Sequence, residues 1–68
     1  MTTFHVFIIG DGDKYNRNCV RIFKNEQILE AKNFARKYAV ESQHGAIAEI
    51  IMYCNGKAEK RVYAVRHK

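Results

Sequence analysis

Apolar residues fill two short runs near the start of the chain, and both runs are rich in β-branched or aromatic side chains. The run TFHVFII at residues 3–9 is apolar at both alternating sets of positions, and NCVRIFK at residues 18–24 follows after a polar stretch. Such residues are favoured in β-strands. The pattern predicts two strands, the first inside a sheet, joined by a hairpin connection at residues 10–17.

The apolar spacing then changes to that of a helix. Asn25 can cap its N-terminus, Glu26 suits its first turn, and Gly45 lies beyond its end. We therefore expect a helix near residues 26–42. Its core face is predicted to carry Ile28, Ala31, Phe34, Ala35, Tyr38 and Ala39, which recur at helical spacing.

The last third of the chain is typical of a second hairpin. The runs AIAEIIMYC at residues 46–54 and KRVYAVRH at residues 60–67 flank Asn55-Gly56, a dipeptide that favours tight hairpin turns. Alternation places Ala48, Ile50 and Met52 on one apolar face. Together the elements predict one small α+β domain over residues 1–68. Its order is ββαββ, with an antiparallel four-stranded sheet and one helix packed on one face.

The polar stretch GDGDKYNRN between the first two strands has the composition of a calcium or phosphate loop but not the spacing. An EF-hand loop starting at Asp11 needs glycine at its sixth position and glutamate at its twelfth. This sequence has Asn16 and Ile22 there. It also lacks GK[ST], and its glycines do not lead into a helix. We interpret the stretch as a turn, and expect neither a metal site nor a cofactor.

Charge points toward the class of partner. Twelve Lys and Arg against seven Asp and Glu give a formal net charge of +5. A basic balance favours contact with nucleic acid or with an acidic protein surface. The same positive charge excludes a role as an acidic mimic of DNA.

Cysteine and hydropathy patterns indicate a soluble intracellular chain. Cys19 and Cys54 lie far apart and outside any CxxC motif, so we expect two buried free thiols rather than a zinc or redox site. The apolar run at residues 4–9 is too short to span a bilayer, and no basic segment precedes it. We expect a complete, soluble chain with no membrane partner.

Catalytic residue patterns are missing from the sequence. His5, His44 and His67 do not lie near a cysteine, serine or acid in an arrangement that supports a triad, and the glutamates are scattered singly. A chain of this size also offers little concavity for a substrate. The sequence predicts a non-enzymatic protein.

One helix covers only one side of a sheet, so the other side meets water or a partner. Strict alternation assigns to this open side His5 and Ile51, together with the candidate contacts Phe7, Arg21, Phe23, Tyr53, Arg61 and Tyr63. Aromatic residues interleaved with arginines suit base stacking and phosphate contact. The same surface suits a homodimer or docking on a protein. A third interpretation is that long side chains cover this side and that the strand registers differ.

One flank of the helix allows two interpretations. Lys32 and Arg36, four residues apart, border the apolar stripe. They form either a solvated face with snorkelling cations or a mixed basic and apolar contact strip. The residues of that strip are Leu29, Lys32, Asn33, Arg36 and Val40.

The run EAKNFARKYAVESQHGAIAEIIMYCNG resembles the middle of a small anti-CRISPR family, the ninth of the named type I-F inhibitors. The shared pieces are Ala31-Lys32 with Lys37, then His44-Gly45, then Asn55-Gly56. The resemblance covers under half of the chain and leaves out the first hairpin.

This resemblance implies a phage-encoded inhibitor in the cytoplasm of a host bacterial cell. Such a protein binds the backbone subunits of a crRNA-guided Cas surveillance complex and stops target DNA from pairing with the guide. Lys32 and Lys37 would be contacts, with Arg36 as their neighbour. Our first hypothesis is therefore an inhibitor that docks on a host protein or ribonucleoprotein complex. The alternative is a small basic nucleic-acid-binding module or dimeric regulator that uses the open side of the sheet.

Overall fold

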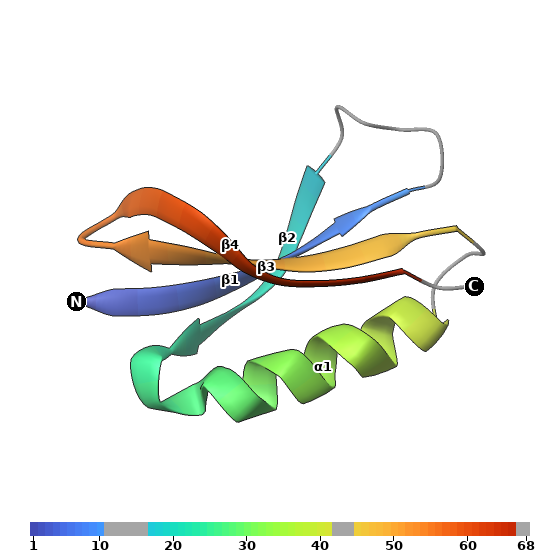
Figure 1. Ribbon diagram of the computed structural model, residues 1–68, viewed down its shortest axis with the longest axis horizontal. Coiled ribbons are helices and arrows are strands. Elements are labelled where there is room, and N and C mark those ends of the chain that lie inside the picture. Colours follow the sequence, from blue (N-terminus) through green and yellow to red (C-terminus); the bar gives the residue numbers. More distant parts are fainter. Residues whose placement is uncertain (11–16, 42–44, 67–68) are drawn as a thin grey trace.

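The computed structural model describes residues 1–10, 17–41 and 45–66. The strands form one antiparallel sheet in the order β2-β1-β3-β4, and the helix packs on it (Figure 1). The predicted α+β fold and its ββαββ order are confirmed. The elements are β1 (Thr2–Ile9), β2 (Arg17–Lys24), a 3-10 turn η1 (Asn25–Gln27), α1 (Ile28–Glu41), β3 (Ile47–Cys54) and β4 (Lys57–Arg66).

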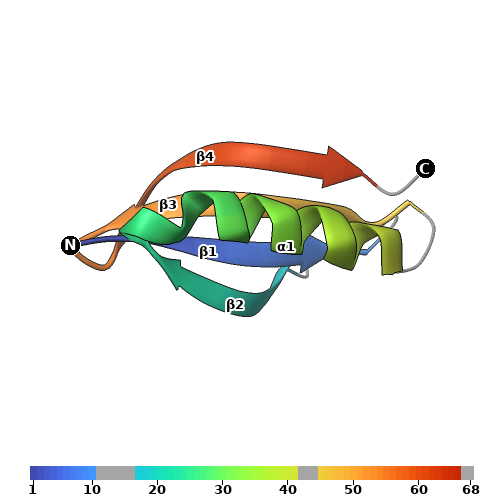
Figure 2. The same cartoon turned by 90° about the horizontal axis from the view of Figure 1, so that it is seen from below.

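The helix lies across the sheet and makes its most extensive contact with the central strand β3 (Figure 2). Ala31, Ala35 and Ala39 are fully buried on its inner face, because alanine lets a helix backbone approach the sheet. They belong to one core with five sheet residues, Phe4, Val6, Phe23, Ala48 and Ile50. The predicted core face is confirmed except at its margin, where Tyr38 is 36% exposed.

Three irregularities interrupt the strand pairing. Val6 of β1 pairs with Arg21 of β2, but the next residue, Phe7, pairs with Cys19, which leaves Val20 of β2 as an extra residue. In β4 two shifts leave Val62 and Glu59 as extra residues. Such β-bulges break the alternation of side chains between the two faces. Residues on either side of a bulge therefore cannot be assigned to a face by counting in twos.

The helix begins later than predicted. Asn25 is the first residue of the 3-10 turn, not the N-cap, and that position belongs to Lys24. The backbone N–H of Lys24 donates to the side-chain oxygen of Gln27 at 3.0 Å, so the glutamine closes this turn. The predicted end of the helix at residue 42 lies outside the described residues, as do residues 11–16 of the predicted hairpin connection.

The predicted tight turn at Asn55-Gly56 is confirmed. Both residues have positive φ, 52° and 83°, which is the backbone geometry that an Asn-Gly hairpin turn supplies. Hydrogen bonds from the N-terminal residue stabilise this turn. The Asn55 N–H donates to the Met1 carbonyl at 2.9 Å, and the terminal amine donates to Asn55 Oδ1 at 2.6 Å.

Both cysteines are free, as predicted, but neither is buried. Cys19 is exposed because it lies on the edge strand β2, and on the side away from the helix, opposite Phe7. Cys54 is half-buried because it is the last residue of β3.

Candidate binding surfaces

The side of the sheet away from α1, which we call the open face, carries mainly apolar side chains at its centre. Directly paired residues share a face, so the registers define it. His5 pairs with Ile51, and Ile51 pairs with Arg61, while Phe7 pairs with Glu49. No described helix or strand packs on this side (Figure 1). The half-buried centre of the open face consists of His5, Phe7, Ile9, Ile47, Ile51 and Tyr53.

Three residues predicted for this side lie on the other. Phe23 is 3% exposed, and its ring packs against Phe34 of α1 with the centroids 5.6 Å apart. Arg21 lies over the same Phe34 ring, and Lys32 of α1 lies over the Tyr63 ring. The prediction was thus correct for Phe7, Tyr53 and Arg61, and wrong for Arg21, Phe23 and Tyr63.

The physical reason is register. In β2, Phe23 pairs with the core residue Phe4, a match that the spacing of side chains within one strand does not reveal. In β4 the extra residue Val62 places Arg61 and Tyr63 on opposite faces, although they are two positions apart.

Three rings stand nearly parallel on the open face. The His5 and Tyr53 rings stack with their centroids 3.8 Å apart, and the Phe7 ring lies 6.4 Å from His5 at an interplanar angle of 15°. Thr3 Oγ1 and His5 Nε2 lie within hydrogen-bond distance, at 3.0 Å. Burial lowers the pKa of His5 below its ordinary value of 6.5, which favours the neutral ring. We call His5, Phe7 and Tyr53 the ring row.

Cationic residues lie at both margins of the open face. Lys24 is opposite Thr3 on β2, while Arg61 and Arg66 are opposite Ile51 and Ile47 on β4. All three cations are exposed.

A buried carboxylate lies beneath one of these cations. Glu49 is only 1% exposed, and its Oε2 atom lies 3.6 Å from Arg61 Nη1. Arg61 itself remains largely in solvent, with 63% of its side chain exposed. The open face thus has an aromatic and aliphatic centre with basic margins.

The outer flank of α1 carries the second surface, the helix strip of Leu29, Lys32, Asn33, Arg36 and Val40. Leu29 and Val40 are 71% and 68% exposed, and the core uses neither of them. The Arg36 guanidinium donates to the Asn33 side-chain oxygen. The Lys32 ammonium lies 5.8 Å from the centre of the Tyr63 ring, within the range of a cation–π contact. Five of the six contact residues predicted on the helix therefore lie together in the helix strip.

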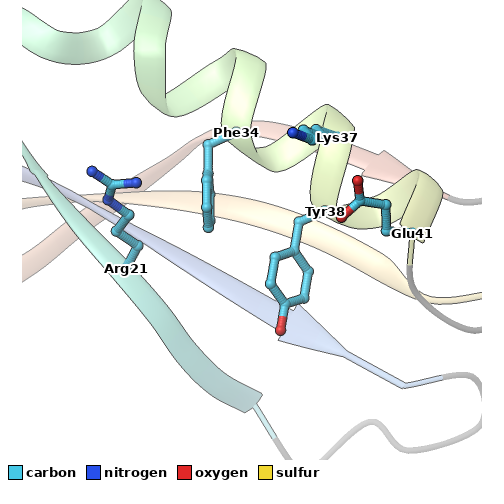
Figure 3. Close-up of a pocket in the computed structure, with 5 residues that line it drawn as sticks. All are labelled: Arg21, Phe34, Lys37, Tyr38 and Glu41. Carbon is cyan, nitrogen blue, oxygen red and sulfur yellow. The ribbon is translucent and has the colours of Figure 1, made fainter.

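The sixth, Lys37, lines a pocket between α1 and β2 that the sequence did not predict (Figure 3). The pocket measures about 400 Å³ and is lined by Arg21, Phe34, Lys37, Tyr38 and Glu41. The Arg21 guanidinium lies 4.8 Å from the Phe23 ring centre and 5.4 Å from that of Phe34. The spacing of Phe34 and Tyr38, one helical turn apart, was the signal available in the sequence. That spacing predicted only that both rings face the core.

Within residues 1–10, 17–41 and 45–66, no group of three His, Cys, Asp or Glu side chains is placed to hold a metal ion. In the same ranges, no helix combines the length and the apolar character needed to cross a bilayer.

Comparison with known proteins gives no match: none among protein-family models, curated proteins or solved structures. The anti-CRISPR resemblance therefore stays a prediction from the sequence. One of its residues, His44, lies outside the described residues.

Proposed function

We propose that this chain is a non-enzymatic inhibitor of the anti-CRISPR kind. It docks through the helix strip on a host protein or crRNA-guided surveillance complex and blocks the binding of target DNA. The observation that carries the proposal is the exposure of Leu29 and Val40 beside Arg36 on a helix whose core contacts are made by other residues.

The composition of the helix strip supports a docking role. The buried centres of protein interfaces are more apolar than the rest of the surface, and arginine is enriched in them. Two cations of the strip are held in place before binding. Arg36 is hydrogen-bonded to Asn33, and Lys32 is placed over Tyr63. Side chains that are already ordered lose less conformational entropy when a partner binds.

The test uses a purified type I-F crRNA-guided complex and a labelled target duplex. The wild-type chain is expected to prevent duplex binding. The double variant Lys32→Glu with Arg36→Glu should need at least about tenfold more protein for the same inhibition, because truncating an interface hot spot costs about 2 kcal/mol or more. The control, Lys57→Glu with Lys60→Glu, changes the net charge equally but on β4, and it should inhibit like the wild type.

Two further outcomes refine or reject the proposal. Lys37→Glu tests the contact that the resemblance implies, since this residue lines the pocket and lies outside the helix strip. If the complex binds its duplex normally at saturating wild-type protein, the inhibitor proposal is wrong. Equal losses in the helix and control double variants would show that net charge, and not the helix strip, drives the effect.

A further inference from the structure

The open face can bind a ligand other than the partner proposed for the helix strip. It lies on the opposite side of the sheet from α1 (Figure 1). A second ligand can therefore bind there while α1 is engaged. The ring row and the basic margins together define what that ligand must offer.

The ring row favours a ligand whose own flat rings can stack on it. His5 and Phe7 on β1 and Tyr53 on β3 stand nearly parallel, so the two outer rings can extend the stack. Aromatic side chains on the central strands of an open sheet are a recurrent platform for unpaired bases. A duplex offers its bases only as edges within the grooves, so the ligand must be single-stranded.

The basic margins of the open face favour an anionic ligand. Lys24 lies on the β2 margin, and Arg61 and Arg66 lie on the β4 margin, across a sheet about 14 Å wide between its edge strands. Along the strands, Arg61 and Arg66 lie two and six residues of β1 away from the row of Lys24. A second copy of this chain would bring the same basic margins to the open face, so it would offer these cations no complementary charge. A phosphodiester backbone instead places negative charge next to each base.

From these two requirements we propose that the open face binds single-stranded nucleic acid. Bases stack on the ring row, and phosphates contact Lys24, Arg61 and Arg66. The buried Glu49 carboxylate, 3.6 Å from Arg61, helps to hold that guanidinium at the margin. The proposal is independent of the inhibitor function, because it uses the opposite side of the sheet.

The test is fluorescence anisotropy with a labelled 15-nucleotide oligothymidine, an oligouridine of the same length and a 15-base-pair duplex. Wild-type protein should bind both single strands more tightly than the duplex. Affinity should fall with salt at a log–log slope near −2, since about three phosphates are contacted at roughly 0.7 each.

Matched pairs of variants locate the site. Tyr53→Leu removes a ring from the open face, and Tyr63→Leu removes one from the helix-covered face. The first should weaken binding by about tenfold, within the range for loss of one stacked base, and the second should leave it within about twofold. Likewise Lys24→Gln should lower the magnitude of the salt slope by about 0.7, whereas Lys60→Gln on the other face should not. Far-ultraviolet circular dichroism checks that each variant is folded.

Three results would overturn the proposal. The first is no binding of either single strand by folded wild-type protein. The second is an equal loss in Tyr53→Leu and Tyr63→Leu. The third is a concentration-dependent dimer in sedimentation that Tyr53→Leu abolishes, because a second copy would then occupy the open face. Each can occur while inhibition of the crRNA-guided complex persists, so this proposal and the proposed function can fail separately.

Discussion

The two faces of the sheet share the same central strands, yet they differ in how they are packed. Toward α1, Val6 and Ile50 are fully buried against alanines, and the space between helix and sheet is filled. On the other side, His5 and Ile51 occupy the neighbouring positions of the same strands and stay half-buried. One face supplies the stability of the fold, and the other carries apolar surface that the fold leaves without a covering element among the described residues.

This contrast shows how a small chain can keep a binding surface. A domain of this size buries a modest share of its surface and is therefore only marginally stable. If one face of its sheet is left uncovered, the other face has to supply most of the stability through tight packing. The three alanines of α1 allow that tight packing. Stability and binding are therefore expected to respond to different residues, even when those residues are adjacent in the sequence.

The largest effect is expected from a pair of adjacent isoleucines on β3. Ile50→Ala should lower the free energy of unfolding by about 2–5 kcal/mol, because it opens a cavity in the core. Ile51→Ala on the open face should cost less than half as much, since Ile51 already contacts solvent. Urea denaturation measures both. Equal losses would mean that the two faces are equally packed.

A second pair compares alanines. Ala35→Leu should destabilise the chain by about 1–3 kcal/mol, because the helix would have to move away from the sheet. Ala64→Leu adds the same atoms at an exposed position of the open face and should change stability by no more than about 0.5 kcal/mol. Thermal unfolding distinguishes them, and a neutral Ala35→Leu would refute close packing of α1.

A smaller effect is expected at the edge of the covered face, where Arg21 lies over the Phe23 and Phe34 rings. Arg21→Met keeps the aliphatic stem and removes the cation. It should cost about 0.5–1 kcal/mol, the usual size of an exposed cation–π contact. Arg66→Met, a cation of the open face, is the control and should be close to neutral.

The smallest effect concerns pH and the ring row. Burial lowers the pKa of His5 in the folded chain, so the unfolded chain binds a proton more readily. This contribution to stability is full above pH 6.5 and is lost as pH falls from there through the lowered pKa. His5→Phe should reduce the drop in melting temperature between pH 7.5 and pH 5. An unchanged drop would assign the pH dependence to other groups.

Patterns that depend on neighbours along the chain were predictable from the sequence. The alanine face of α1 follows from helical spacing, the Asn55-Gly56 turn follows from its positive φ requirement, and the place of β1 inside the sheet follows from its two apolar faces. These features are set by a few consecutive residues.

Patterns that depend on pairing between strands were not predictable. The face of Phe23 is set by its pairing with Phe4, and the face of Tyr63 by the extra residue Val62. Nothing in VRIF or RVYA marks a bulge. For the same reason the pocket beside Arg21 was missed, since it exists only because that residue faces α1.

The contrast between the two faces is tested most directly by methyl-resolved NMR of the wild-type chain during titration with the 15-nucleotide oligothymidine. The δ1 methyl of Ile51 reports the open face, and that of Ile50, the next residue, reports the core. We predict that the Ile51 signal shifts with added strand while the Ile50 signal stays in place, and that Leu29 and Val40 stay in place too. Shifts at Leu29 and Val40 without a shift at Ile51 would contradict the assignment, because the strand would then lie on the helix strip.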